Sequence, residues 1–114
     1  MTYYKIATID ATANHYGSAV SPPIASTIST GNNNFVMING RLILTTSNLI
    51  NTPSHMYSVG PPPLYHSHSN QIVDNQKNKL LKINGEYILL ETDKNNANDT
   101  RIDVAGQNLV MINV

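Results

Sequence analysis

Short apolar runs separated by turn-forming residues set the pattern of the chain. Runs of four to seven residues lie at Tyr3–Ile9, Ile24–Ile28, Phe35–Ile38, Leu42–Thr46, Leu80–Ile83, Tyr87–Leu90 and Leu109–Ile112. Runs of this length, rich in β-branched and aliphatic residues and bounded by Asn, Gly, Pro and Ser, are typical of strands. No stretch of twelve residues keeps the apolar spacing of a helix without an interrupting Asn, Gly or Pro. The pattern therefore predicts an all-β fold.

Two β-hairpins can be located from their turns. Asn39-Gly40 separates the apolar run 35–38 from the run 41–44, and Asn84-Gly85 separates 80–83 from 86–90. A two-residue Asn-Gly loop between apolar runs predicts a tight hairpin, because both turn residues must take positive φ.

The hairpins belong to a sequence repeat. When the isoleucines of its copies are aligned, six positions match in three segments, which are Asn34–Asn39, Lys79–Asn84 and Asn108–Asn113. The spacings of 45 and 29 residues are unequal, which excludes a solenoid, since a solenoid needs a fixed period. We interpret the copies as three similar β units packed with pseudo-threefold symmetry in one small domain.

Composition narrows the class of protein. The chain has 114 residues and is formally neutral, with seven Lys and Arg against seven Asp and Glu. This length fits one small domain over residues 1–114. A neutral chain lacks a basic footprint, so we expect no nucleic-acid partner. Only 12% of the residues are charged, while sixteen are Asn. Asn suits turns better than helix interiors, which strengthens the prediction of a turn-rich β protein.

The sequence also argues against disulfides, a membrane anchor and a signal peptide. The chain has no cysteine, which excludes disulfides and thiolate metal ligands. Its apolar runs are too short to span a bilayer, so we expect no stable membrane anchor. The first residues lack the basic region and apolar stretch of a signal peptide.

The segment 51–68, with prolines at 61, 62 and 63, is predicted to be an ordered loop or cap, because proline cannot donate to a β-ladder.

The four histidines are the main candidate metal ligands of the chain. His15 and His55 flank the first hairpin, and His66 and His68 form an H-x-H pair. On an extended segment, residues i and i+2 point to the same side, so that one metal ion can take both imidazoles. Four histidines would make a closed structural site, whereas three with a water would leave a site of catalytic form. A metal clip would also stabilise a small domain with a limited core.

The residues leave two alternative functions open. The spacing of Gly60, His66 and His68 resembles the opening of the cupin metal motif, but the glutamate and the later histidine of that motif are absent. A small cupin-like metal-dependent enzyme would need an open metal position and a pocket. The other alternative is a generic β binding domain, which would need no metal. No G-x-S-x-G motif and no carboxylate pair supports catalysis, so we expect no enzyme activity.

The ordered series of motifs resembles the PAAR-repeat family over residues 12–114. The series is His15, then Ser21–Ile24, then Ile28–Gly31, and then the strand end Val36–Gly40. His55, His66 and His68 fall where this family has its later metal-binding histidines. The name-giving quartet is replaced by Leu42–Thr45, and the cysteine that often completes the family's site is absent.

The resemblance implies a function without catalysis. PAAR-like proteins are small cones that cap the trimeric β-helical spike of contractile injection machines, such as type VI secretion systems and contractile phage tails. The resemblance thus implies a spike protein as partner and a vertex held by His15, His55, His66 and His68 on zinc, with iron possible. It implies a place at the tip of the apparatus, on a virion tail or in the cytoplasm before release without a signal peptide. We expect a bare tip without an effector extension.

Overall fold

The structure is a computed structural model that describes residues 2–17, 23–97 and 99–114. The described residues form twelve strands and no helix. In chain order the strands are β1 (Tyr3–Lys5), β2 (Thr12–His15), β3 (Ile24–Ile28), β4 (Met37–Ile38), β5 (Arg41–Leu42), β6 (Ile50–Ser58), β7 (Leu64–Gln71), β8 (Lys82–Ile83), β9 (Glu86–Tyr87), β10 (Lys94–Asn95), β11 (Thr100–Val104) and β12 (Met111–Asn113). The predicted all-β class is confirmed. The molecule is elongated, with extents of 48 × 30 × 22 Å.

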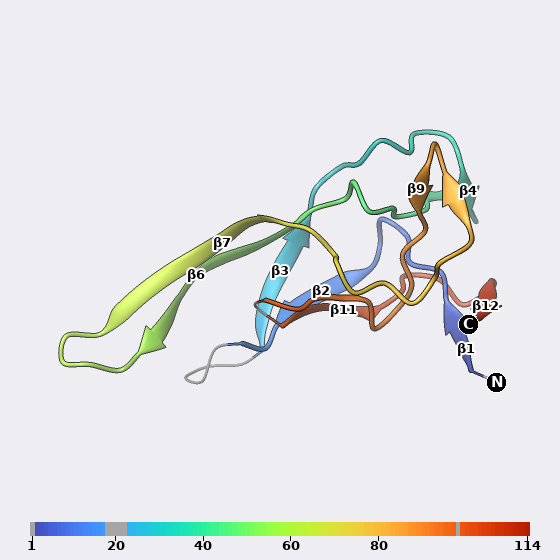
Figure 1. The fold of residues 1–114 in the computed structure, drawn as a ribbon. Coiled ribbons are helices and arrows are strands. Elements are labelled where there is room, and N and C mark those ends of the chain that lie inside the picture. Colours follow the sequence, from blue (N-terminus) through green and yellow to red (C-terminus); the bar gives the residue numbers. More distant parts are fainter. Residues whose placement is uncertain (1, 18–22, 98) are drawn as a thin grey trace.

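Six strands form one antiparallel sheet that curls along the long axis, in the order β10-β11-β2-β3-β6-β7. The β6–β7 hairpin continues beyond the rest of this sheet and forms one end of the molecule (Figure 1). The short strands β1, β4, β9 and β12 gather at the opposite end, where both chain termini lie (Figure 1). We call these the hairpin end (the loop between β6 and β7) and the base (β1, β4, β5, β8, β9 and β12 with the adjoining residues 6–8, 33–36, 43–45, 78–81, 88–90 and 105–110).

The prediction of a loop or cap for residues 51–68 is wrong. Most of this segment belongs to β6 and β7, the two longest strands of the chain. The three consecutive prolines lie in the connection between these strands, where no ladder hydrogen bond is lost. The pairing of β6 with β7 is irregular, with register shifts between Ile50 and Thr52 and between Thr52 and His55. The strands of this hairpin are rich in polar residues and do not alternate between apolar and polar positions. The sequence pattern therefore did not predict them.

Both predicted Asn-Gly hairpins are confirmed. Strands β4 and β5 join at Asn39-Gly40, with φ of 52° and 76°, and β8 and β9 join at Asn84-Gly85, with φ of 52° and 78°. The third copy of the repeat also forms an antiparallel pair, but its second strand comes from the start of the chain. Strand β12 pairs with β1, so residues at opposite ends of the sequence complete the third unit.

The three units share one hydrogen-bonding device, a buried side-chain amide at the start of each unit. Asn33 donates to the carbonyls of Val36 and Ile43, both at 2.9 Å, and accepts the N–H groups of Phe35 and Val36. Asn78 and Gln107 make the same set of bonds. Asn78 bonds Leu80, Leu81 and Ile88, and Gln107 bonds Leu109, Val110 and Ile6.

A closed cycle of backbone hydrogen bonds joins the units at their centre. The N–H of Ala7 donates to Leu89, that of Leu89 to Leu44, and that of Leu44 to Ala7, at 3.0, 3.0 and 2.9 Å. All three residues are buried and belong to a core cluster that continues under the large sheet. A second core cluster of Ile6, Ile43 and Ile88 with their neighbours fills the base itself. The sequence repeat is therefore also a repeat of contacts.

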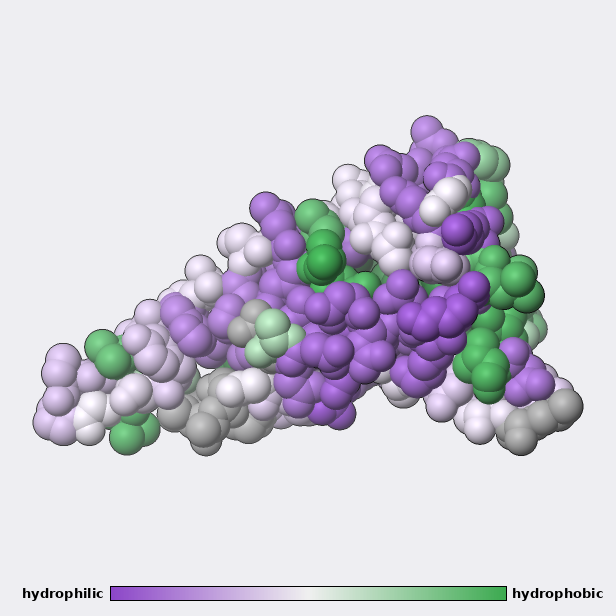
Figure 2. Space-filling model, in the orientation of Figure 1, coloured by the Kyte–Doolittle hydropathy of each residue, from purple (hydrophilic) through white to green (hydrophobic). Residues whose placement is uncertain are grey.

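The base exposes apolar side chains at equivalent positions of the repeat. Phe35, Leu80 and Leu109 follow the buried amide of each unit by two residues and are 63%, 82% and 70% exposed. In Figure 2, hydrophobic residues gather at the base, whereas the adjoining sheet region is mostly hydrophilic. Among the described residues, no helix has the length and apolarity that crossing a membrane would require.

Candidate metal centre

Strands β2, β6 and β7 bring three of the four predicted histidines together. In β2 the side chains alternate, so that Ala13 and His15 are buried while their neighbours are more exposed. His55 is buried on β6, and His68 is half-buried on β7. All three histidines therefore lie on strands, whereas a loop or cap was predicted for the segment with His55 and His68. They lie where the β6–β7 hairpin leaves the large sheet.

The geometry of the three rings fits one metal ion. His15, His55 and His68 each offer a nitrogen, and these atoms all lie within 4.8 Å of one another. The ring centroid of His15 is 4.8 Å from that of His55 and 4.7 Å from that of His68. Zinc–imidazole bonds are about 2.0–2.1 Å long, so atoms at such mutual distances can surround a single ion with small side-chain adjustments.

A hydrogen bond at Nδ1 leaves the Nε2 atom of His55 for a ligand. His55 Nδ1 lies 2.8 Å from the carbonyl of Pro53, which can only accept, so that Nδ1 carries the proton. The Nε2 atoms of His55 and His68 are buried and have no hydrogen-bond partner. Buried nitrogens without a partner are costly unless something binds them. A metal ion would satisfy both.

Burial keeps His68 in the protonation state that a metal needs. Desolvation lowers the pKa of His68 below its ordinary value, and the neighbouring His15, His66 and His55 act in the same direction. His68 is therefore neutral at physiological pH, and a neutral imidazole has the lone pair that binds a metal.

His66 is near the three-histidine group but not part of it. Its ring centroid is 4.5 Å from that of His68, its i+2 neighbour on β7, and 4.7 Å from that of His55, its cross-strand partner on β6. The side chain is nevertheless exposed, and its ring stacks on Tyr57 at a centroid distance of 4.2 Å. His66 thus flanks the group on the side of the hairpin end.

Thr100 is a residue of the site that sequence reasoning missed. Its Oγ1 lies 3.1 Å from His15 Nδ1, and both residues are buried. No pattern in the sequence connects two residues that are 85 positions apart. Only the pairing of β11 with β2, which sets Thr100 opposite His15, brings them together.

Three imidazoles are a donor set for zinc or iron. Such a set leaves a further position for a water molecule or another ligand, whereas a closed structural site needs a fourth side chain. The buried donors and the orphaned Nε2 atoms fit a metal ion.

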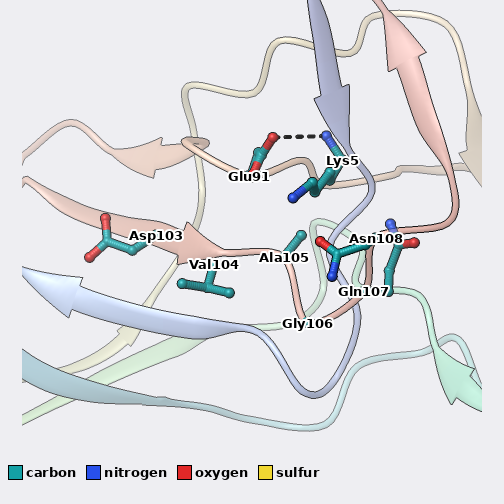
Figure 3. Close-up of a pocket in the computed structure, with 8 residues that line it drawn as sticks. All are labelled: Lys5, Glu91, Asp103, Val104, Ala105, Gly106, Gln107 and Asn108. Carbon is teal, nitrogen blue, oxygen red and sulfur yellow. Dashed lines mark hydrogen bonds between the residues drawn. The ribbon is translucent and has the colours of Figure 1, made fainter.

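A separate hollow of about 300 Å³ lies beside β1 and β11 and has no histidine in its lining (Figure 3). Its two carboxylates already have partners, because Glu91 accepts the N–H of Lys5 and Asp103 accepts hydrogen bonds from Asn14 and Tyr16. The three histidines, not this hollow, are therefore the candidate functional site.

Comparison of the chain with protein-family models, with curated proteins and with solved structures finds no match to any of them.

Proposed function

We propose that this protein is a non-enzymatic tip that caps the trimeric β-helical spike of a contractile injection machine, with a histidine-bound metal ion near its narrow part. The proposal joins the sequence resemblance to PAAR-repeat proteins with the contacts of the base. The observation that carries it is the repeat of hydrogen bonds in three units around the cycle of Ala7, Leu44 and Leu89.

The base has the symmetry that a trimeric partner needs. Three units with the same buried amide and the same connections support a pseudo-threefold base, and the elongated shape from the base to the β6–β7 hairpin supports the proposed cone. A single chain that repeats its own contacts three times can present equivalent contacts to all three chains of a threefold partner.

The exposed apolar residues of the base support the same partner. Phe35, Leu80 and Leu109 occupy equivalent positions and would meet equivalent positions of the three spike chains. Exposed apolar patches commonly mark contacts with other proteins. The short strands of the three units also have edges, and strands of the spike could pair with the backbone groups at these edges.

The metal ion would act as a clip. His15 lies on β2, in the large sheet, while His55 and His68 lie on the projecting hairpin. An ion shared by all three would tie the hairpin to the sheet where the molecule narrows and has little core. Zinc is the proposed metal and iron the alternative. The corresponding location is the tip of the injection apparatus.

Co-expression with a trimeric spike protein from the same genome tests the proposal. We expect a complex of one chain per spike trimer, measured by light scattering after size exclusion. Leu80→Asp should abolish this complex, whereas Val59→Asp should not, because Val59 is 69% exposed but lies at the hairpin end. Failure to bind any such spike, or a complex of three chains per trimer, would refute the proposal.

A further inference from the structure

A buried network of hydroxyl and amide groups continues from His15 into the sheet. The Oγ1 of Thr100, which contacts His15 Nδ1, donates to Gln71 Oε1 at 3.1 Å. Gln71 Oε1 also accepts from Thr52 Oγ1 at 3.3 Å, and Thr52 Oγ1 in turn lies 2.9 Å from Ser26 Oγ. Thr100, Thr52 and Gln71 are 0%, 2% and 6% exposed. The network therefore has little access to water. Gln71 takes part through Oε1 alone, because its Nε2 is buried and has no hydrogen-bond partner.

An irregularity in β7 places Gln71 in this network. His68 and Gln71 are three residues apart and would point to opposite faces of a regular strand. Asn70 takes a φ of 53°, and the register shifts between the pairs Ile50–Gln71 and Thr52–His68. The N–H of Asn70 donates to Asn51 Oδ1, which holds the irregular turn of the backbone. Both His68 and Gln71 can therefore serve the same interior.

We propose that Thr100 and Gln71 are positioning residues that fix the tautomer and the orientation of His15 for metal binding. The proposal rests on the metal site of the proposed function. A neutral His15 that binds a metal through Nε2 must carry its proton on Nδ1. Nδ1 then donates to Thr100 Oγ1, so the single hydroxyl proton of Thr100 must go to another acceptor. Gln71 Oε1 is that acceptor.

The other buried histidine of the site shows why His15 needs this support. His55 Nδ1 faces the carbonyl of Pro53, a backbone acceptor that cannot donate and thus fixes the tautomer by itself. A threonine hydroxyl can either donate or accept, so the contact with Thr100 does not by itself define which nitrogen of His15 holds the proton. Gln71 removes this ambiguity because its oxygen takes the hydroxyl proton.

Zinc affinity of matched variants tests the assignment. Thr100→Val keeps the shape of the side chain but cannot accept from His15, and we expect zinc affinity to fall by about 10- to 100-fold, measured by competition with a chromophoric chelator. Thr100→Ser should restore it. Thr8→Val is the matched control, because Thr8 is equally buried but bonds the carbonyl of Ala105 in the base. This control should lose stability without losing zinc affinity.

Variants of Gln71 separate the acceptor oxygen from simple packing. Gln71→Leu fills the space without an acceptor and should weaken zinc binding like Thr100→Val. Gln71→Glu supplies an acceptor oxygen and should keep zinc binding near that of the wild type. If Gln71→Leu binds zinc as well as the wild type, the positioning role is wrong.

Nitrogen-15 NMR of the imidazole rings gives a readout that a merely structural role would not change. In the zinc-loaded wild type we expect His15 protonated at Nδ1, and in Thr100→Val a mixture of tautomers when zinc is removed. A wild type that binds zinc with His15 protonated at Nε2 would overturn this inference alone. A wild type that binds no zinc would overturn the proposed metal site, and this inference with it.

Discussion

Asn33 shows how the abundant asparagines of this chain are used. Its amide is 5% exposed and makes two donated and two accepted bonds with backbone groups of its own unit. A strand pair of only two residues has few ladder bonds, so a side-chain amide supplies the missing partners. The sequence shows the high Asn content but not which asparagines are buried, because Asn33 and Asn34 are identical letters in the same turn.

Replacement of these neighbours gives a direct comparison. Asn33→Ala leaves several buried backbone groups without partners and should lower the free energy of unfolding by about 3 kcal/mol. Asn34→Ala removes an exposed side chain and should change it by less than about 0.5 kcal/mol. Urea denaturation of both variants measures the difference. Equal losses would mean that the buried amide does not hold the unit together.

Glu86 connects the first and second units through one carboxylate. It accepts from the hydroxyls of Thr45 and Ser47 at 2.9 and 2.8 Å and from Asn32 Nδ2 at 2.8 Å. Desolvation acts to raise the pKa of Glu86, but the hydrogen bonds from Ser47, Asn32 and Thr45 outweigh it and hold the pKa below its ordinary value.

The depressed pKa of Glu86 gives a pH dependence of known sign. A carboxyl group with a lower pKa in the folded state stabilises the fold above its ordinary pKa of 4.5, and this contribution is lost as the pH falls through the folded-state pKa. The melting temperature of Glu86→Gln should therefore lie below that of the wild type at neutral pH, and the gap should narrow in acid. Thermal unfolding over a pH series measures this, and a constant gap would contradict it.

At the scale of the element, the sequence pattern predicted the two short Asn-Gly hairpins but not the long β6–β7 hairpin. The Asn-Gly turns at 39–40 and 84–85 were predictable because a two-residue turn dictates its own backbone geometry. Strand β3 has the bounds that its apolar run predicted, Ile24–Ile28. The β6–β7 hairpin was not predictable, because its polar strands and irregular register follow no period.

Glycines of equivalent backbone geometry should differ in their tolerance to substitution. Gly40 has a φ of 76°, and a Cβ there would meet nothing within 4 Å, so Gly40→Ala should cost only the backbone strain of about 1–2 kcal/mol. Gly106 has a φ of 86°, and a Cβ there would lie 2.6 Å from the carbonyl carbon of Asp10. Gly106→Ala should therefore cost about 2 kcal/mol more. Chemical denaturation ranks the two variants, and a reversed order would contradict the packing described around Gly106.

At the scale of the whole molecule, the metal site depends on contacts that no local pattern contains. The four histidines could be chosen from the sequence because they were the concentrated ligand residues in a chain without cysteine. Their division into a group of three and an exposed His66 follows from how the curled sheet brings β2 close to the β6–β7 hairpin, although β3 lies between them in the strand order. Thr100 and Gln71 carry no signal of their own in the sequence, since buried threonine and glutamine are not specific to metal sites.

Removal of the metal should affect the variants of the site differently. A chelator should lower the melting temperature of the wild type, because a bound ion present at 100 times its dissociation constant stabilises a fold by about 2.7 kcal/mol. His55→Ala should bind no ion and show no response to the chelator. His66→Ala should keep both the ion and the response, because His66 is exposed and outside the group. Elemental analysis and calorimetry measure both, and loss of the ion in His66→Ala would add His66 to the ligands.

The completion of the third unit by β1 has a consequence for how the chain reaches its fold. Gln107 bonds the carbonyl of Ile6 across 101 residues of sequence, and the central cycle at Ala7 needs partners from both other units. Translation delivers β1 long before its partner β12. Until β12 is synthesised, β1 lacks this partner, so the third unit of the base forms last. Since long-range pairing slows folding, this late closure should be the rate-limiting step.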